Sequence, residues 1–313
     1  MDKIVKIENL VKKYNGIPAV DNISMDIDEG EIMGLLGPNG AGKSTTINII
    51  TGLISMDKGN VSVCNLDIKK HGNEVKKSIG VVPQEIAIYE DLTALENVMF
   101  FASLYGLSGK PLKQRAEEAL EFTGLKDKAK SLPKEFSGGM KRRLNIACAI
   151  AHRPRLIIMD EPTVGIDPQS RNHILQSVKM LNEMGSTIIY TSHYMEEVEE
   201  ICTDIAIMDH GKIIARGSKE ELTGMISDTD TLCIVPECGI CKIDVDKIKQ
   251  INGVVAIETE DNAIRITNTR NANNLDRIIS FFMSNGIIIK NLEIRRPDLE
   301  TVFLAITGRK LRD

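Results

Sequence analysis

The stretch "GPNGAGKST", residues 37–45, decides the fold class of this 313-residue chain. It fits the phosphate-loop pattern G-x-x-x-x-G-K-[ST] in full, with the strand-like run "EIMGLL" before it and helix-like spacing after it. The glycines allow backbone N–H groups to close around a phosphate, Lys43 can reach the β- and γ-phosphate oxygens, and Ser44 can ligate Mg²⁺. A chance glycine-rich turn is the alternative, and the strand and helix on either side weigh against it.

Strand-like and helix-like segments alternate around this loop. Residues 1–36 hold short stretches such as "KIVKIENL" and "ISMDID", separated by turn residues. Apolar runs recur in "RLIIMDEP", "STIIYTSH" and "DIAIMDHG", each beside helical material. This alternation predicts an α/β domain in which helices cover both faces of a mostly parallel sheet.

The stretch at about 88–150 has a different character. "LTALENVMFFASLYGL" and "LKQRAEEALEFTGL" show the spacing of amphipathic helices that end at glycine or proline. We expect a helical subdomain inserted into the α/β core, within a first domain that covers 1–223.

A second, small domain is expected at 224–313. "TLCIVPE" is typical of a strand, "DVDKIKQI" of a helix, and "VVAIETE" with "AIRITNT" of a hairpin around Asp261 and Asn262. "NNLDRIISFFMSNG" then indicates a helix and "IIIKNLEIRRP" a strand, which gives the β-α-β-β-α-β order of a ferredoxin-like α+β unit. A last helix is expected in "DLETVFLAITG".

Two adjacent carboxylates, Asp160 and Glu161, end the apolar run "RLIIMDEP". Such a pair is unfavourable at the end of a buried strand unless a cation lies nearby. A salt bridge or a helix cap is the usual explanation for Asp-Glu in this position. Because the chain also has a phosphate loop, we predict instead that Asp160 holds Mg²⁺ and that Glu161 polarises the attacking water of a phosphoryl transfer.

The stretch "EFSGGMKRRL", residues 135–144, looks like a second anion site. Ser137, Gly138 and Gly139 precede a helix-prone run, and free backbone N–H groups at a helix start attract anions. The sequence thus raises the question of why one chain carries two phosphate-binding elements.

Composition excludes several classes of protein. With 39 Lys and Arg against 44 Asp and Glu, the net charge is −5, and no basic run suggests that the chain binds nucleic acid. No stretch approaches the length of about 18 apolar residues that a membrane span needs. If the protein acts at a membrane, another chain is expected to supply the spans.

The six cysteines lack the density of a disulfide framework, which favours a reducing compartment. The segment "CIVPECGIC" contains Cys233, Cys238 and Cys241, and its CxxC raises the possibility of a metal or redox site. A second CxxC or an adjacent histidine pair is missing, so ordinary loop thiols are the favoured interpretation.

The phosphate loop, "FSGGMKRR", "LIIMDEP" and "TSH" occur in an order and at a spacing that resemble the ATPase subunit of an ATP-binding cassette transporter. The resemblance covers about residues 3–220. It implies a P-loop cassette with an N-terminal antiparallel β subdomain, and ATP and Mg²⁺ as the nucleotide and metal. The C-terminal unit is similar to those of exporter ATPases that handle drugs, antibiotics, lipids or sodium.

The resemblance also implies roles for single residues. Tyr14 matches an aromatic residue that stacks on adenine, Gln84 matches a glutamine that touches Mg²⁺ or the attacking water, and His193 matches a histidine that contacts the γ-phosphate. The implied catalytic residues are Glu161, His193, Lys43 and Gln84, and the implied metal-binding residues are Ser44, Gln84 and Asp160. The implied nucleotide-binding residues are Tyr14, Gly37, Asn39, Gly40, Ala41, Gly42, Lys43, Ser44, Thr45, Ser137, Gly138, Gly139 and Asp167.

In this family two cassettes pair head to tail, so the resemblance implies a homodimer with composite ATP sites. Ser137, Gly138 and Gly139 would close on ATP held by the partner's phosphate loop, and Asp167 would lie in a loop that crosses to the partner. Two departures affect this motif set: Phe136 and Met140 replace the commoner Leu and Gln of the signature, and Val164 and Ile166 alter the crossing loop. The residues that would face phosphate are retained.

The expected partner is an integral membrane permease subunit, and the expected location is cytoplasmic, at the inner face of the cell membrane. "ENVMFFASLYGL" offers aromatic side chains for contact with that subunit, although an apolar helical stripe is as often part of a core. Two alternatives stay open. One is a soluble cassette ATPase with a non-transport task, and the other is a nucleotide-binding regulator without turnover, which Glu161 and His193 disfavour.

Overall fold

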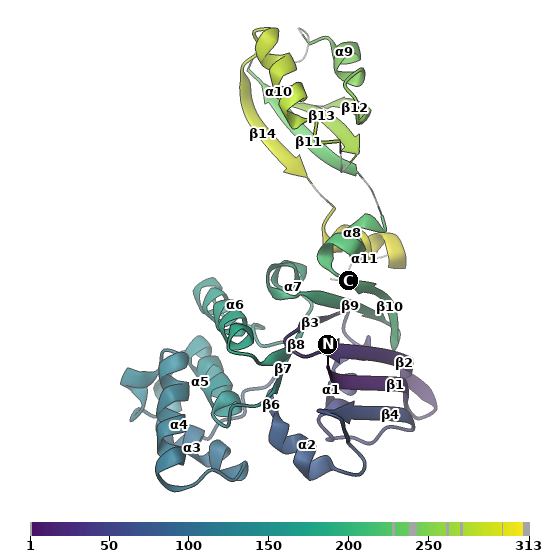
Figure 1. Ribbon diagram of the computed structural model, residues 1–313. Helices are drawn as coiled ribbons and strands as arrows, with labels where there is room; N and C mark the ends of the chain where they lie inside the picture. Colours follow the sequence, from purple (N-terminus) through teal and green to yellow (C-terminus); the bar gives the residue numbers. More distant parts are fainter. Residues whose placement is uncertain are drawn as a thin grey trace. The chain divides into compact units, whose positions relative to one another are not determined.

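The computed structural model describes residues 2–226, 229–237, 243–260, 263–269, 272–295 and 297–308, except the side chains of 260 and 295. The chain forms two compact units (Figure 1). One runs from the N-terminus to Lys219, and the other begins at Glu220.

The first unit is built on a six-stranded sheet with the order β10-β9-β3-β8-β7-β6. Strands β6, β7, β8, β3 and β9 are parallel to their neighbours, and β10 is antiparallel to β9. The bounds are β3 (Ile32–Leu36), β6 (Ile79–Val82), β7 (Leu156–Asp160), β8 (Thr187–Ser192), β9 (Asp204–Asp209) and β10 (Lys212–Gly217). The mostly parallel sheet predicted from the sequence is therefore confirmed.

Both faces of this sheet are covered, which explains why its strands are almost continuously apolar. On β7, Leu156 and Ile158 pack in one core with helix α1 (Lys43–Ile50), whereas Ile157 and Met159 pack in another. The second core includes residues of α5 (Gly138–Ile150), α6 (Pro168–Glu183) and α7 (Met195–Ile201). The alternation of side chains along a strand thus assigns each residue to one layer.

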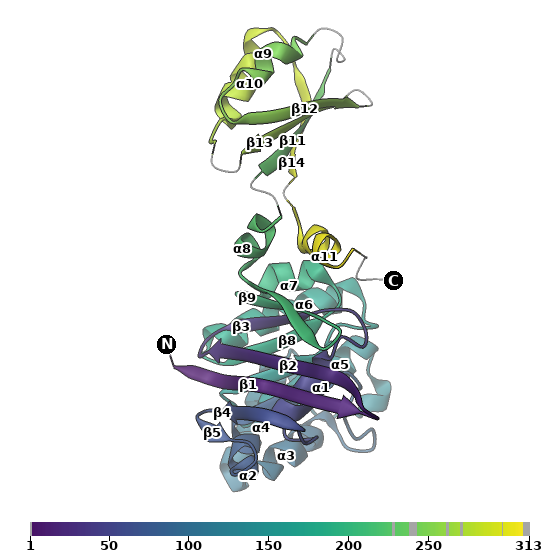
Figure 2. The ribbon, with the colours of Figure 1, turned by 90° about the vertical axis from the view of Figure 1, so that its right-hand side faces the viewer.

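An antiparallel sheet with the order β2-β1-β4-β5 packs in the same core as α1. Both ribbon views place α1 beside this sheet (Figures 1 and 2). Its strands are β1 (Lys3–Tyr14), β2 (Ile17–Asp28), β4 (Lys58–Val63) and β5 (Leu66–Asp67). Asn15 and Gly16 join β1 to β2, and both have positive φ values, of 51° and 82°. This is the backbone that a two-residue Asn-Gly hairpin turn requires.

The helical insertion lies between β6 and β7 in the chain. It comprises α3 (Ala94–Leu104), α4 (Gly109–Phe122) and α5, with 3-10 turns at Lys126–Lys128 and Pro133–Glu135, while α2 (Gly72–Ser78) precedes β6. Helix α3 begins at a capping box in which Thr93 and Glu96 bond each other's backbone N–H. All three helices contribute apolar residues to the second core described above, together with α6. Apolar packing therefore holds the insertion to the rest of the first unit.

The second unit follows the order β11 (Thr229–Pro236), α9 (Val245–Lys249), β12 (Val254–Glu260), β13 (Ala263–Thr269), α10 (Leu275–Ser284) and β14 (Ile289–Arg295), flanked by α8 (Lys219–Gly224) and α11 (Leu299–Thr307). Its antiparallel sheet has the order β12-β13-β11-β14. Ile248 of α9 and Phe282 of α10 share a core with the sheet residues Ile234 and Ile266. The expected hairpin turn at 261–262 lies outside the described residues.

Candidate active site

The phosphate loop follows the buried strand β3 and leads directly into α1. A Cβ atom at Gly37 would collide with the carbonyl oxygen of Met208, and one at Gly42 would collide with that of Ala19. Gly42 also has a φ of 105° and caps α1 without a side-chain hydrogen bond. Glycine is therefore needed for both space and backbone conformation, and the first N–H groups of α1 are left for a ligand.

A cavity of about 250 Å³ opens over this loop. Residues 39–45 line it together with Tyr14, Ala19, Gln84 and Glu161, which come from separate segments. Tyr14 ends β1 and is 48% exposed, as a side chain that receives a flat ligand must be. The structure thus brings ten of the predicted site residues to one cavity: Tyr14, Asn39, Gly40, Ala41, Gly42, Lys43, Ser44, Thr45, Gln84 and Glu161.

Lys43 is a buried cation at the start of α1, with only 5% of its surface exposed. Its Nζ atom donates hydrogen bonds to the carbonyl oxygens of Gly37 (2.7 Å) and Pro38 (3.2 Å) and lies 3.7 Å from Oε1 of Glu161. Burial lowers the pKa of Lys43, and the negative charges of Glu161 and Asp160 oppose that shift. These contacts hold the Lys43 ammonium group at the cavity in one side-chain conformation.

Glu161 follows β7 in a left-handed backbone conformation, with a φ of 46°. Its backbone N–H donates to Oγ1 of Thr191 (2.8 Å), and the Thr191 hydroxyl in turn donates to Oδ1 of Asp160 (2.7 Å). A positive φ at a non-glycine residue is strained and persists only where surrounding contacts enforce it. Here Thr191 of the adjacent strand β8 supplies such a contact to the Glu161 backbone and also bonds the Asp160 carboxylate.

His193 follows the C-terminal end of β8 and joins the site through Glu161. Its Nδ1 atom lies 3.2 Å from Oε2 of Glu161, whose other carboxylate oxygen faces Lys43. The imidazole packs against the ring of Tyr194, with 4.2 Å between the ring centroids. A cation, a carboxylate and an imidazole therefore form one continuous line of contacts.

Gln84 follows β6, and its loop is fixed by the signature helix α5. The buried guanidinium of Arg142 donates to the carbonyl oxygens of Pro83 (2.7 Å) and Gln84 (2.6 Å). Burial lowers the pKa of Arg142, whose partners here are neutral carbonyl groups. The backbone of Gln84 is thus tied to the same helix that begins at the Ser-Gly-Gly motif.

Ser137, Gly138 and Gly139 do not line the phosphate-loop cavity. Ser137 caps α5 by accepting a hydrogen bond from the Met140 N–H (3.3 Å), and both Ser137 and Gly138 are exposed. Asp167 caps α6 by accepting from the Ser170 N–H (2.9 Å), a bond that lowers the pKa of its carboxyl. A Cβ at Gly139 would collide with Ser170, so the signature lies against the first turn of α6.

Three contributors to the site were not singled out in the sequence. Thr191 bonds the backbone N–H of Glu161 and the carboxylate of Asp160, Arg142 fixes the Gln84 loop, and Ala19 lines the cavity. Thr191 lies in the motif "TSH" and Arg142 in "GGMKRR", so proximity to a motif could have found these two. Ala19 has no such signal because only the fold brings β2 beside the phosphate loop.

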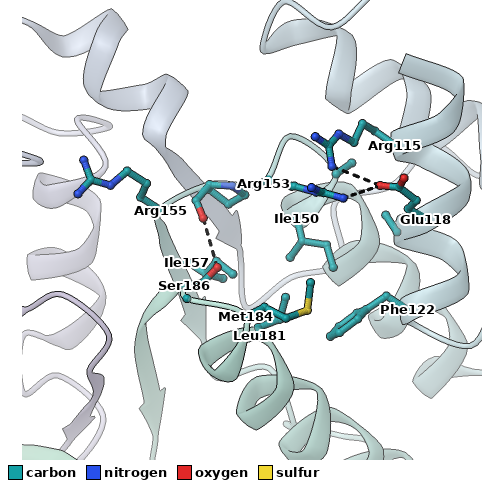
Figure 3. Close-up of a pocket in the computed structure, with 14 residues that line it drawn as sticks. Arg115, Glu118, Phe122, Ile150, Arg153, Arg155, Ile157, Leu181, Met184 and Ser186 are labelled. Atoms are coloured by element: carbon teal, nitrogen blue, oxygen red, sulfur yellow. Dashed lines mark hydrogen bonds and ion pairs between the residues drawn. The ribbon is translucent and has the colours of Figure 1, made fainter. Parts of the chain in front are cut away.

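A second cavity of about 250 Å³ lies elsewhere in the first unit, where α4, the end of α5, β7 and the end of α6 meet (Figure 3). Its apolar lining includes Phe122, Ile150 and Leu181. At its edge Glu118 pairs with Arg153 (2.9 Å) and Arg115 (3.3 Å), as Figure 3 shows. None of the predicted site residues lines this cavity, and we assign it no part in the candidate site.

The cysteine segment divides between described and undescribed residues. Cys233 is buried within the strand β11 as a free thiol, and so it does not belong to a loop. Cys238 and Cys241 lie outside the described residues. Within the described ranges, no group of three or more His, Cys, Asp or Glu side chains could by itself hold a metal ion. Nor does any helix in those ranges have the length and apolarity needed to cross a membrane.

The fold and the cavity define a P-loop nucleotide-binding cassette, and comparison with known proteins gives the family. A sequence model described as "ABC transporter" matches residues 20–164. The linearmycin resistance ATP-binding protein LnrL of Bacillus subtilis (strain 168) is 46% identical over 99% of this chain and 100% of its own length. The daunorubicin/doxorubicin resistance ATP-binding protein DrrA of Streptomyces peucetius is 32% identical, over 99% of this chain and 94% of its own.

The chain belongs to the ATP-binding proteins of ABC transporters. A Nod factor export ATP-binding protein I of Cupriavidus metallidurans, 34% identical over the full length of both chains, agrees with the predicted resemblance to exporter ATPases. Among solved structures, an ATP-binding subunit of an ABC transporter matches with a TM-score of 0.66 and 29% identity, over 71% of this chain and 93% of that one.

A second solved structure bears on the activity. It is the dimeric, post-hydrolysis state of an ATP-binding cassette bound to ADP and Pi, and it matches with a TM-score of 0.63 and 32% identity. The match covers 68% of this chain and 98% of that one. The predicted class of enzyme, an ATPase of the transporter family, is therefore confirmed.

Proposed function

We propose that this chain hydrolyses ATP as a head-to-tail homodimer and thereby drives export of a substrate through a separately encoded membrane subunit. One observation carries the proposal: Lys43, Ser44, Gln84 and Glu161 meet in one cavity, whereas Ser137 and Gly138 are exposed elsewhere on the same chain. The second anion site would then serve ATP bound to the partner. The matching dimeric cassette supports this arrangement.

Each residue of the candidate site has a task that its chemistry fits. Lys43 and the N–H groups of the loop would bind the phosphates, and the exposed ring of Tyr14 would stack on adenine. Glu161 would accept a proton from the attacking water, because its carboxylate is fixed between Lys43 and His193. His193 would contact the γ-phosphate and hold Glu161 in place.

The residues also fit Mg²⁺, which favours hard oxygen ligands and is usually held by one or two carboxylates together with substrate phosphates. Ser44 and Gln84 line the cavity, and the Asp160 carboxylate is oriented by Thr191. We assign these three side chains to the metal. When bound, Mg²⁺ would neutralise charge on the phosphates.

Closure of the dimer would complete the site. Ser137, Gly138 and Gly139 would bring the start of α5 to the partner's γ-phosphate, and Asp167 would lie in the loop that crosses between the two cassettes. Donors delivered only on closure stabilise the charge of the transition state and make hydrolysis conditional on pairing. This gives a single reason for the two anion sites in one chain.

The helical insertion offers a surface for a membrane subunit at the cytoplasmic face. Tyr89, Phe100 and Phe101 form an aromatic cluster with ring centroids 5.0 to 6.0 Å apart, and Tyr89 and Phe100 are partly exposed. An exposed aromatic cluster of this kind commonly marks an interaction site. The Gln84 loop is tied to this insertion through Arg142, so contact there could reach the ATP site.

The test is affinity purification of the full chain from detergent-solubilised native membranes, with and without ATP, followed by mass spectrometry. We expect to recover a protein with several membrane spans. Phe100→Glu should lose that protein, and Leu53→Glu, which also changes an exposed apolar residue, should keep it. Recovery of soluble partners alone, from a detergent that preserves other membrane complexes, would instead favour a cassette ATPase with a non-transport task.

A further inference from the structure

Glu197, on helix α7, is a buried carboxylate outside the ATP cavity. Only 2% of its surface is exposed, and its Oε2 atom accepts hydrogen bonds from three hydroxyl groups. The donors are Thr163 (2.8 Å), Tyr190 (2.9 Å) and Ser192 (3.0 Å). A buried charge is costly unless it is paired and hydrogen-bonded, so such a constellation requires a fixed set of partners.

The other oxygen of this carboxylate faces a cation. Oε1 of Glu197 lies 3.2 Å from Nε of Arg171, on α6, although neither of these buried atoms makes an aligned hydrogen bond. The Arg171 guanidinium also lies over the ring of Tyr194, 4.8 Å from its centroid. Arg171 is therefore held by a carboxylate and by an aromatic face.

The partners of Glu197 belong to the segments that carry the candidate catalytic groups. Thr163 is two residues after Glu161, and Ser192 immediately precedes His193. Arg171 lies in α6, whose N-terminal cap is Asp167. Glu197 thus links three segments that are separate in the sequence.

The residues before and after His193 both contact members of this network. The Ser192 hydroxyl donates to Glu197 and accepts from the Tyr194 N–H (2.9 Å). On the other side of His193, the Tyr194 ring contacts both the imidazole and the Arg171 guanidinium. The groups on both sides of the imidazole are therefore in contact with Glu197 or with its partner Arg171.

We propose that Glu197 is a positioning residue of the ATPase site, which acts through Ser192 and the Arg171–Tyr194 pair to hold His193 against Glu161. This inference rests on the proposed roles of Glu161 and His193. It adds a connection from the α6 cap at Asp167, which is proposed to face the partner cassette, to the imidazole at the ATP site. The proposed contact with the partner cassette and the proposed ATP hydrolysis would then both depend on the buried carboxylate of Glu197.

The test uses Glu197→Gln in the full-length chain, because the amide keeps the size of the side chain and removes its charge. Loss of a hydrogen-bonding group that orients a metal ligand typically costs about 10- to 100-fold in activity, and by analogy we expect a fall of that size in kcat. The KM for ATP should change little, because no residue of the cavity lining is altered. Glu200→Gln is the matched control, since Glu200 lies on the same helix and pairs only at the surface with Lys179 (2.9 Å).

A second readout is independent of turnover. In protein labelled at histidine Cε1, the resonance of His193, assigned by its loss in His193→Ala, should shift in Glu197→Gln and stay in place in Glu200→Gln. Should Glu197→Gln fail to fold, Arg171→Gln removes the same ion pair from its partly exposed side. A normal kcat, or a lowered kcat with an unmoved His193 resonance, would overturn the inference. A normal kcat in His193→Ala would instead show that the proposed role of His193 is wrong.

Discussion

The chain has two helix starts suited to an anion, and they differ in what surrounds them. At the start of α1, Lys43 is 5% exposed and is fixed by carbonyl oxygens and by Glu161. At the start of α5, Ser137 and Gly138 are exposed, and the Ser137 side chain satisfies one backbone N–H of its own helix. The first start is embedded in a cavity that other segments complete, and the second is presented at a surface.

Under the proposed function, this difference would make hydrolysis conditional on the pairing of two chains. A helix start enclosed by its own chain can bind nucleotide in the monomer, because every lining group is already in place. A helix start at the surface contributes only when another surface brings a ligand to it. We infer that the region around the start of α1 binds ATP by itself, and that ATP hydrolysis requires both this region and the start of α5.

The largest expected effect separates turnover from binding within the α1 region. Glu161→Gln should lower kcat by about 10²- to 10⁴-fold, the usual contribution of a general base, while ATP affinity is retained. Because ATP then persists, the variant should form a dimer in ATP, measured by light scattering coupled to chromatography. Glu183→Gln, an exposed substitution on α6, is the control. A Glu161→Gln protein that stays monomeric in saturating ATP would contradict closure by ATP.

A smaller effect is expected from the α5 region. Ser137→Ala should lower kcat by about 10²-fold, as loss of one transition-state donor does. Its affinity for ATP in dilute, monomeric protein should equal that of the wild type, measured by titration of a fluorescent ATP analogue. If ATP binding to the monomer weakened as much as kcat, the two regions would not be separate.

Ser137 is also a helix cap, and its loss should reduce the free energy of unfolding by about 1 kcal/mol. Thr93→Ala removes an equivalent cap from α3 and provides the matched control. We expect both variants to lose similar stability in urea denaturation, and only Ser137→Ala to lose turnover. Equal losses of kcat would assign the effect of Ser137→Ala to folding.

A further prediction concerns the affinity for nucleotide. Stacking of a base on an aromatic side chain contributes about 1–3 kcal/mol, so Tyr14→Ala should weaken the free energy of ATP binding by that amount, which raises the Kd, and leave the kcat at saturation nearly unchanged. Tyr14→Phe should behave like the wild type. Calorimetry of both variants would test this, and an unchanged Kd in Tyr14→Ala would remove Tyr14 from the site.

The sequence predicted the parts of this site that are written in consecutive residues. The phosphate loop, the strand-end carboxylates and the histidine after β8 each have a local pattern, and the parallel sheet brings the ends of their strands to one edge. The alternation of strands and helices similarly indicated the element order of the second unit. In these cases a local sequence pattern was sufficient to make the prediction.

The supporting contacts could not be predicted in the same way. Thr191 bonds Asp160 and Glu161 across two strands, Arg142 reaches the Gln84 loop from α5, and Glu197 joins three segments. Most of these contacts join residues that lie far apart in the sequence, and no periodic sequence pattern relates such residues to each other. Such residues become visible only when packing has fixed which strand and helix are neighbours.

The most direct test of the central claim mixes two inactive proteins. Lys43→Ala impairs the α1 region and Ser137→Ala impairs the α5 region, so a heterodimer of the two contains one composite site with both intact groups and one with neither. We expect the mixture to regain ATPase activity, while each variant alone stays at its low level. No gain in activity, under conditions where differently tagged subunits co-purify as heterodimers, would contradict a site shared between two chains.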